Sequence, residues 1–460
     1  MRRVEMVIRG GVVVNPDWQG RADLLIADSK VHALADEAPP ELYRKAEVVD
    51  ATGKWVLPGG VDPHVHVGIE FSGFRTADDF RTCGLAALHG GSTTIIDFAI
   101  PRPGQSPVNA VAERSALAKE SPVDVALHGC VIAGDADLPA QLQELAVAGV
   151  TTVKMFTTYR GLLMVEPDTI RRVMEVLRDV GGLAYIHAET NHLIEAAQER
   201  LVTGGKLTPP HFPGSRPRDA EEDAVGWVLH LASLVRAPVY FVHQTTPRAV
   251  DLVRRARLRG VQAFSETCPH YLLLDETVYA GRHAERFICS PPMRDRRAVA
   301  GLMQRVLAGW VDTLGSDHCC FTAEQKLNGT DDFRGAPPGL PGVEIRLPLL
   351  FSELVRRRGM SPSRFVELVA TNPARLIGLF PRKGILAPGS DADLMILNPD
   401  TEWTVHAAAL HMPTDFTPFE GIQMRGKPEI VISCGQVVIQ NGELLALRQG
   451  VLLRAGQAPS

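Results

Sequence analysis

The chain has 460 residues, 45% of them hydrophobic and 22% charged, which is typical of a globular protein large enough for more than one domain. Its formal net charge of −5 excludes the basic excess that nucleic-acid binding requires. The apolar start of the chain is interrupted by Arg9 and Gly10, so we expect neither a signal peptide nor a membrane span. The seven cysteines are odd in number and scattered, which favours a reducing compartment, and we expect the cytoplasm.

Both ends of the chain consist of short strand-like segments. MVIRGGVVV, at residues 6–14, is interpreted as a hairpin, and ADLLIAD, KVHALAD and AEVVDATGKWV follow it. Near the far end, SDADLMILN, EIVISCGQVVIQNGE and LLALRQG also predict short antiparallel strands. We therefore expect residues 1–55 and 385–460 to form one β-sandwich domain from both termini.

The middle of the chain, residues 56–384, alternates apolar runs with helix-like segments. The runs are VDPHVHV, STTIIDFAI, VDVALHGCVI, VTTVKMFTT, LAYIHAE, APVYFVHQT, VQAFSETC and VDTLGSDH. Strands that alternate with helices predict an α/β fold, a TIM-like (β/α)8 barrel with a parallel sheet. Such barrels carry their chemistry at the C-terminal ends of the strands, so the residues at which each run stops are the candidates for function.

The first of these runs ends in His64-Val65-His66. Residues two apart on a strand face the same side, so both imidazoles can reach one metal ion. Taken alone, the pair favours two exposed or hydrogen-bonded histidines rather than a metal site.

The fourth run contains a lysine, Lys154, between apolar neighbours. A lysine inside an apolar strand is costly unless it is paired or chemically altered. One interpretation is a buried lysine with a carboxylate partner. The other is a carboxylated lysine, in which CO₂ has added to the neutral amine and the carbamate can bridge two cations. Burial favours the second, because it lowers the pKa of the amine.

Three further runs end at His187, His243 and Asp317. Each histidine alone could be a satisfied core residue, and Asp317 could cap a loop. Histidines, a lysine and an aspartate at successive barrel-strand ends nevertheless predict, as a set, a metal site.

This set of residues resembles the pattern of the amidohydrolase superfamily, and most closely that of the hydantoinase and dihydropyrimidinase family. PGGVDPHVHV resembles the metal-binding entry motif, and TTVKMFTTY resembles the carboxylated-lysine strand followed by a tyrosine. YIHAE, FVHQTT, ETCPHYLLLD, SPPMRD, GSDHCCFT and GLPGVEIR resemble later segments in the same order. The similarity continues to the C-terminal strands and covers nearly the whole chain.

The resemblance implies an enzyme that opens the cyclic amide of hydantoins or 5,6-dihydropyrimidines and gives N-carbamoyl amino acids. It implies two divalent metal ions, zinc or alternatively manganese, held by His64, His66, carboxylated Lys154, His187, His243 and Asp317. His64, His66 and Asp317 would bind one ion, His187 and His243 the other, and Lys154 both. A bridging hydroxide would attack, Asp317 would pass its proton to the leaving nitrogen, and Tyr159 would donate a hydrogen bond to the oxyanion.

The substrate implied by the resemblance is a small cyclic ureide or imide. Ser290 falls where the family holds the ring amide with main-chain groups. Pro338 replaces an asparagine common in the family and offers a carbonyl but no N–H donor. Val67 follows the first histidines where dihydroorotases carry a carboxylate-binding arginine. Apolar residues near the strand ends suit an alkyl or aromatic substituent: Ile69, Phe71, Phe156 and Leu163, with Phe74 and Leu162 beside them.

Two alternatives remain open at this point. One is another cyclic amidohydrolase such as an allantoinase, although Tyr159 favours the hydantoinase branch. The other is a non-catalytic binding protein similar to the collapsin-response-mediator proteins, which have lost metal ligands that this chain retains. The resemblance also implies a homotetramer, with no nucleic-acid partner and no membrane association.

Overall fold

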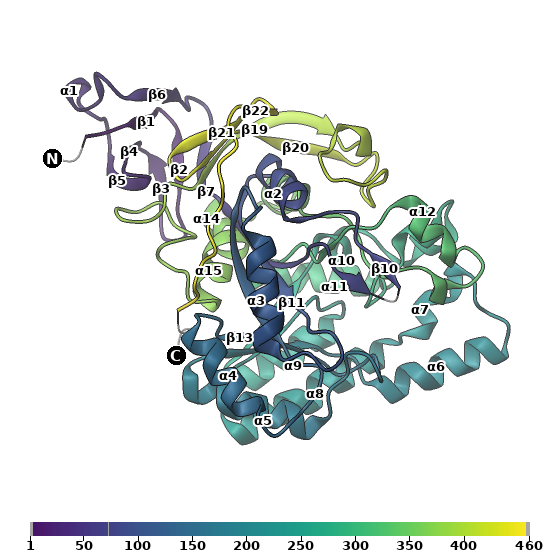
Figure 1. The fold of residues 1–460 in the computed structure, drawn as a ribbon. Coiled ribbons are helices and arrows are strands. Elements are labelled where there is room, and N and C mark those ends of the chain that lie inside the picture. Colours follow the sequence, from purple (N-terminus) through teal and green to yellow (C-terminus); the bar gives the residue numbers. More distant parts are fainter. Residues whose placement is uncertain (1–2, 72, 457–460) are drawn as a thin grey trace.

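The apolar runs of the middle of the chain form the strands of one parallel sheet in the computed structural model, which describes residues 3–71 and 73–456. The strands are β8 (Gly60–His66), β11 (Ser92–Ala99), β12 (Asp124–Cys130), β13 (Thr152–Phe156), β14 (Leu183–His187), β15 (Val239–Phe241), β16 (Ala263–Thr267), β17 (Thr313–Leu314) and β18 (His318–Cys319). β17 and β18 are two pieces of the eighth strand, and β18 pairs with β8. The sheet thus closes on itself, and the predicted (β/α)8 barrel is confirmed (Figure 1).

Helices surround the barrel on its outside (Figure 1). They are α2 (Phe80–His89), α3 (Pro107–Ala118), α4 (Leu138–Val147), α5 (Pro167–Val180), α6 (Asn191–Thr203), α7 (Phe212–Ser215), α8 (Arg218–Val235), α9 (Pro247–Arg257), α10 (Pro269–Leu273), α11 (Arg296–Leu307), α12 (Ala323–Lys326), α13 (Arg346–Leu350), α14 (Pro362–Val366) and α15 (Asn372–Leu376). Among the described residues, no helix combines the length and the apolar character that crossing a membrane would need.

The sequence of α5 shows how these helices attach to the sheet. Ile170, Val173, Met174 and Leu177 follow one another at steps of three and four residues, and all four are buried. The helix begins with proline and ends at Gly181, whose φ of 69° is the left-handed conformation that glycine adopts without strain. The barrel strands beneath are buried on both sides, and every residue of β11 is buried.

Two further sheets lie beside the barrel: one combines strands from both termini, and the other consists of N-terminal strands alone. One has the order β22 (Glu443–Leu444), β21 (Gln436–Gln440), β20 (Gln423–Ser433), β19 (Leu394–Thr404), β7 (Trp55–Pro58), β2 (Val12–Val14) and β3 (Gln19–Arg21). The other has the order β5 (Lys30–Ala35), β4 (Asp23–Ala27), β1 (Met6–Arg9) and β6 (Glu47–Asp50). One apolar cluster contains side chains of both, including Ile8, Leu24, Val56 and Ile432. The purple and yellow strands of Figure 1 thus form the predicted β-sandwich. The domain boundaries 1–55, 56–384 and 385–460 stay predictions, and residues 1–2 and 457–460 of the outer two segments lie outside the described residues.

Two local predictions at the termini are wrong. MVIRGGVVV is not a hairpin, because β1 and β2 belong to different sheets. The chain changes sheets at Gly10 and Gly11, where a Cβ on Gly11 would lie 2.7 Å from a methyl carbon of Val56. LLALRQG ends its strand at Leu444, and the chain then packs on the barrel, where Val125 N–H donates to Val451 O over 3.0 Å.

Candidate metal centre and substrate cavity

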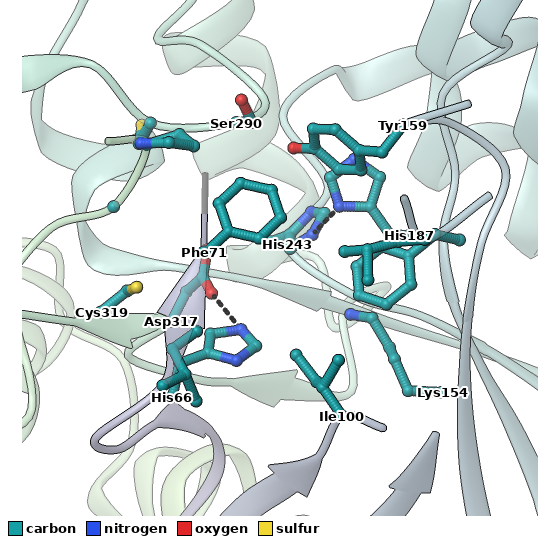
Figure 2. Close-up of a pocket in the computed structure, with 16 residues that line it drawn as sticks. His66, Phe71, Ile100, Lys154, Tyr159, His187, His243, Ser290, Asp317 and Cys319 are labelled. Carbon is teal, nitrogen blue, oxygen red and sulfur yellow. Dashed lines mark hydrogen bonds and ion pairs between the residues drawn. The ribbon is translucent and has the colours of Figure 1, made fainter. Parts of the chain in front are cut away.

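The C-terminal ends of the barrel strands bring the predicted site residues together around one cavity. Figure 2 shows His66, Lys154, His187, His243 and Asp317 arranged around it. His66 and His187 end β8 and β14, Lys154 lies within β13, His243 follows β15 by two residues, and Asp317 directly precedes β18. His64 lies deeper, on the same face of β8 as His66, and its side chain is fully buried.

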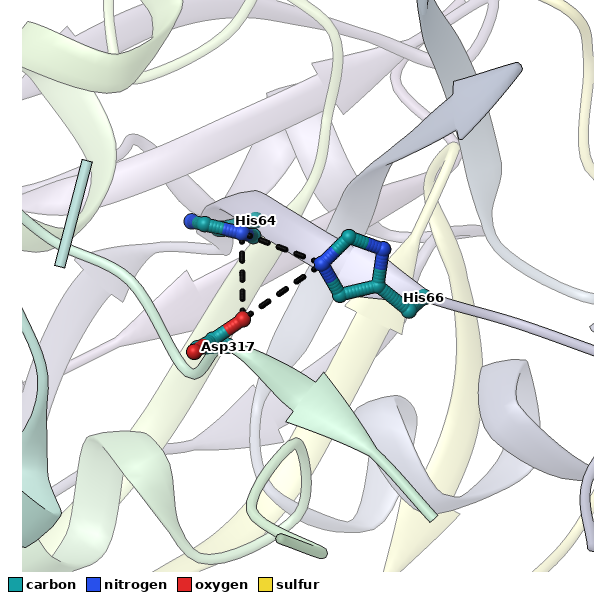
Figure 3. A group of neighbouring side chains, drawn as sticks. All are labelled: His64, His66 and Asp317. Atoms are coloured by element: carbon teal, nitrogen blue, oxygen red, sulfur yellow. Dashed lines mark hydrogen bonds and ion pairs between the residues drawn. The ribbon is translucent and has the colours of Figure 1, made fainter. Parts of the chain in front are cut away.

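Three donor atoms converge in the first group, which comprises His64, His66 and Asp317 (Figure 3). His64 Nε2 lies 3.2 Å from His66 Nε2 and 3.1 Å from Asp317 Oδ1, and His66 Nε2 lies 3.5 Å from that oxygen. Tetrahedral zinc with bonds of about 2.0–2.2 Å separates its ligand atoms by roughly 3.3–3.6 Å. The triangle therefore matches one face of such a coordination sphere to within a few tenths of an ångström.

A second pair of donors lies across the cavity. His187 Nδ1 is 2.9 Å from His243 Nε2, so two imidazole nitrogens approach each other as they would around a shared cation. In each group, one histidine has one ring nitrogen hydrogen-bonded to a carboxylate, which leaves its other ring nitrogen free for a metal. His64 Nδ1 donates to Glu266 Oε1 over 2.7 Å, and His187 Nε2 donates to Glu189 Oε2 over 2.7 Å.

The sequence reasoning assigned no role to Glu189 or Glu266, although both are fully buried at the ends of barrel strands. A buried carboxylate in an apolar run needs a partner, and that signal is visible in YIHAE and FSETC. Periodicity does not say which partner, since Glu266 is far from His64 in the sequence. Glu266 also accepts from the main-chain N–H of His243 over 3.0 Å and so links both groups.

Lys154 lies between the two groups, and its side chain is buried. Within the described part of the chain its Nζ has no hydrogen bond or ion pair; its neighbours are the rings of Phe98 at 4.8 Å and Phe156 at 5.2 Å. Burial lowers the pKa of Lys154 to about 8, against the opposing charges of Asp317 and Glu266. At neutral pH, on the order of one amine in ten is then uncharged and open to CO₂.

The protonation states of the buried histidines favour the binding of a cation. Burial lowers the pKa of His66 and of His187 to about 4, and it holds that of His243 well below its usual range. These three imidazoles are therefore neutral at pH 7, the form that binds metal. Burial also opposes a charge on His64, but the carboxylates of Asp317 and Glu266 outweigh it and raise its pKa to about 9. Positive charge is thus stabilised at the position where the donors converge.

Backbone strain is concentrated at the same place. Tyr159, His243 and Asp317 have φ angles of 70°, 39° and 50°, in the left-handed region that non-glycine residues rarely adopt. Next to Asp317, a Cβ on Gly315 would lie 2.8 Å from Glu266 Oε2, so only glycine fits where the eighth strand is interrupted. The surrounding fold therefore holds these side chains at the cavity against a local conformational cost.

Apolar side chains make up much of the cavity lining. Beside the candidate metal ligands it is lined by Ile69, Phe71, Phe156, Tyr159, Leu163, Ser290 and Pro338, and also by Ile100, Cys289, Cys319 and Gly339, to which no role had been assigned. Leu162 and Phe74, which were also expected to add apolar bulk, are not among its lining residues. No arginine lines it either, as far as the described residues show.

The wall that carries Ser290 and Pro338 is held by a buried lysine. Lys326 Nζ donates to Ile288 O and to Pro337 O, each over 2.7 Å. Gly339 N–H donates to the same Ile288 carbonyl over 3.1 Å. Two chain segments, at residues 288–290 and 337–339, are therefore joined through one ammonium group.

The donor set fits divalent metal ions. Imidazole nitrogens and a carboxylate oxygen suit zinc and similar ions, and His66 Nδ1 is a buried nitrogen without a hydrogen-bond partner among the described residues. A cation with an acidic neighbour at the mouth of an apolar cavity can support hydrolysis of a neutral amide.

Comparisons with known proteins agree with this chemistry. The sequence profile of the amidohydrolase family matches residues 55–438. The chain is 34% identical over 443 residues to a D-hydantoinase of Ralstonia pickettii, which covers 95% of this chain and 96% of the relative. It is 35% identical over 443 residues to a D-phenylhydantoinase of Escherichia coli, covering 95% of each. Among solved structures, the dihydropyrimidinase from Brevibacillus agri matches with a TM-score of 0.96 at 33% identity and covers 99% of each chain.

Proposed function

The chain belongs to the amidohydrolase family, and from this we propose that it is a cyclic amidohydrolase that opens hydantoins or 5,6-dihydropyrimidines to N-carbamoyl amino acids. Relatives named for these reactions align along almost the whole chain. The observation that carries the proposal is the convergence of the two donor groups on an apolar cavity, with Lys154 unpartnered between them.

The proposed metal ligands are His64, His66 and Asp317 for one divalent ion and His187 and His243 for another. The ions would be zinc, with manganese as the alternative. When bound, such ions lower the pKa of water and polarise a carbonyl oxygen. His66, His187 and His243 contribute neutral nitrogens, and Glu266 and Glu189 fix which nitrogen of His64 and His187 is free for a metal.

Lys154 is proposed to carry a carbamate. The amine is buried beside two phenylalanine rings and has a lowered pKa, conditions that favour its neutral form. As a carbamate, the side chain would carry a negative charge shared by two oxygens. Such a group could bind both ions at once.

Asp317 and Tyr159 are proposed to act on the substrate during the reaction. The carboxylate of Asp317 would accept a proton from the attacking water and deliver it to the leaving nitrogen. The phenol of Tyr159 would donate a hydrogen bond to the oxygen on which negative charge develops. Both side chains line the cavity, as both roles require.

The lining supports a neutral ring that carries an apolar substituent. Ser290 and Pro338 would hold the ring amide through main-chain groups, and Pro338 can only accept. Ile69, Phe71, Phe156 and Leu163 would surround the substituent. Because the relatives named above are D-hydantoinases, the D enantiomer is the one proposed to react.

Turnover of the purified protein tests this proposal. We expect hydantoin and dihydrouracil to be converted to N-carbamoyl products, identified by mass spectrometry, and a chelator to abolish the conversion until zinc or manganese is restored. Allantoin as the only substrate turned over would assign the chain to another cyclic amidohydrolase. Absence of turnover with every ring in the fully metallated protein would refute the enzymatic assignment.

Two proposals concern the whole protein, its oligomeric state and its location. The homotetramer rests on the resemblance and on exposed apolar side chains near the C-terminus, Leu444, Leu445 and Leu447, which an interface could cover. Light scattering measures the oligomeric state.

A location in the cytoplasm is supported by the seven cysteines, which all lie in the described part of the chain and are all free.

A further inference from the structure

A buried arginine, Arg216, connects the candidate metal ligand His187 with Tyr159. Its Nε donates to both oxygens of Glu189, each over 3.1 Å, and its Nη2 donates to Glu189 Oε2 as well. That same Oε2 accepts from His187 Nε2 over 2.7 Å. The guanidinium carbon lies 5.0 Å from the centre of the Tyr159 ring.

Tyr159 has further contacts besides Arg216: its carbonyl oxygen accepts from the N–H groups of Leu162 and Leu163, and its hydroxyl is hydrogen-bonded to Ser290. Its backbone is in the left-handed region, so the local chain does not favour its conformation. Its ring meets the rings of Phe71 at 5.6 Å, His187 at 5.4 Å and Phe156 at 6.2 Å, and all three contacts are at steep or tilted angles. Arg216 is the charged group in contact with the ring, and a planar guanidinium can stack where an ammonium cannot.

Arg216 is itself held firmly. Only 5% of it is exposed, and Arg294 Nη1 donates to its carbonyl oxygen over 2.5 Å. Its partner Glu189 is tied to the Tyr159 loop, because Glu189 N–H donates to Thr157 Oγ1 over 2.8 Å and that hydroxyl donates to Glu189 O over 2.8 Å. The arginine, the glutamate and the start of the tyrosine loop therefore form one rigid unit beside β14.

We propose that Arg216 is a positioning residue for the reaction: through its stack on Tyr159 and its pair with Glu189, it sets the phenol at a fixed place relative to His187. This inference rests on the proposed role of Tyr159 as the oxyanion donor. A cation stacked on the ring also strengthens the phenol as a donor, so the same contact aids the hydrogen bond as negative charge develops on the substrate.

Arg216→Lys is the variant that separates this role from a structural one. A lysine keeps the positive charge opposite Glu189, so the metal ligand His187 remains supported, but it lacks the flat face that covers the tyrosine ring. We expect kcat for 5-phenylhydantoin to fall about tenfold, the size of a desolvated cation–π contact, with wild-type metal content by elemental analysis.

The decisive comparison is made with Tyr159→Phe. That change alone should lower kcat by roughly 10²–10³. If Arg216 acts through the phenol, adding Arg216→Lys should lower kcat no further, within about twofold, because coupled residues are not additive. Arg257→Lys is the matched control, since Arg257 is paired with Asp312 at the opposite ends of the strands; its kcat should stay at the wild-type value.

Each other outcome is decisive. Wild-type kcat in Arg216→Lys, loss of metal from it, or multiplied losses in the double variant would overturn the inference. If Arg216→Lys does not fold, Arg216→Gln, whose planar amide can still donate to Glu189, is judged by the same outcomes. Absence of 5-phenylhydantoin turnover in the wild type, or an unchanged kcat in Tyr159→Phe, would instead refute the proposed function.

Discussion

The buried amine of Lys154 gives the first prediction at the scale of single residues. Two cations at close range repel each other, and the proposed carbamate offsets this. Lys154→Ala should therefore lose at least one metal ion and most activity, measured by elemental analysis and turnover. A short carboxylate such as acetate, which can enter the space left by the side chain, should restore part of both.

A second buried lysine provides the control for this change. Lys383 is paired with Asp124 and Asp393, and none of these three is among the described residues that line the cavity. Lys383→Ala should lower the free energy of unfolding but keep the metal content. Full metal content and normal activity in Lys154→Ala would contradict carboxylation.

Asp317 is proposed to combine metal binding with proton transfer. Replacing one of its carboxylate oxygens by an amide nitrogen separates the two roles. Asp317→Asn keeps an oxygen that can bind metal weakly, but it cannot accept a proton. We expect much of the metal to remain while kcat falls by roughly 10²–10⁴. Metal content is measured in parallel. A near-normal kcat in this variant would refute the proposed proton-transfer role.

The candidate ligands could be predicted from the sequence because each lies in or just beyond the C-terminal half of a strand, and these strand ends meet at one rim of a barrel. Glu189 and Glu266 could not be given a role, since their function depends on which histidine nitrogen they contact. The same holds for Arg216, which precedes α8 and reaches the site only through the folded chain. The sequence pattern thus identifies residues that the order of the strands brings to the site. It misses residues whose role depends on which distant side chain they contact.

At the scale of elements, the strands of the barrel followed from their apolar runs, but two features did not. The eighth strand is interrupted at residues 315–317, because Asp317 adopts a left-handed backbone to face the cavity. The N-terminal pair β1 and β2 divides between two sheets, because Gly10 and Gly11 allow close approach to β7 and its preceding loop. Both features depend on contacts between segments distant in the sequence, which the local hydrophobic pattern does not predict.

The wall segments at residues 288–290 and 337–339 give a prediction at this scale. Lys326→Met removes the ammonium that joins them, while the metal ligands lie on other elements. We expect KM to rise on the order of tenfold and kcat to change less, because the loss concerns substrate holding rather than the transition state. Steady-state kinetics measure both constants.

Lys383→Met is the control for this variant too, since it removes a buried ammonium remote from the cavity. It should destabilise the protein and leave KM unchanged. An unchanged KM in Lys326→Met, with wild-type metal content, would show that the wall does not depend on this lysine.

At the scale of the whole molecule, a barrel supplies the rim of strand ends and both termini fold beside it as a sandwich (Figure 1). The seven-stranded sheet needs both ends of the chain, since β7 pairs with both β2 and β19. The chain therefore leaves the sandwich, completes the barrel and returns. This architecture matches the dihydropyrimidinase of Brevibacillus agri with a TM-score of 0.96, so the choice of substrate must lie in the cavity rather than in the fold.

The cavity is proposed to select a neutral ring with an apolar substituent. Burying the carboxylate of dihydroorotate without a partner is costly, whereas an apolar substituent gains roughly 0.8 kcal/mol per buried methylene. The most direct test is kcat/KM for hydantoin, 5-phenylhydantoin, dihydrouracil and dihydroorotate, measured on one metallated preparation. We predict a rise from hydantoin to 5-phenylhydantoin, acceptance of dihydrouracil and poor use of dihydroorotate. Efficient hydrolysis of dihydroorotate, with no turnover of the hydantoins or of dihydrouracil, would contradict the account.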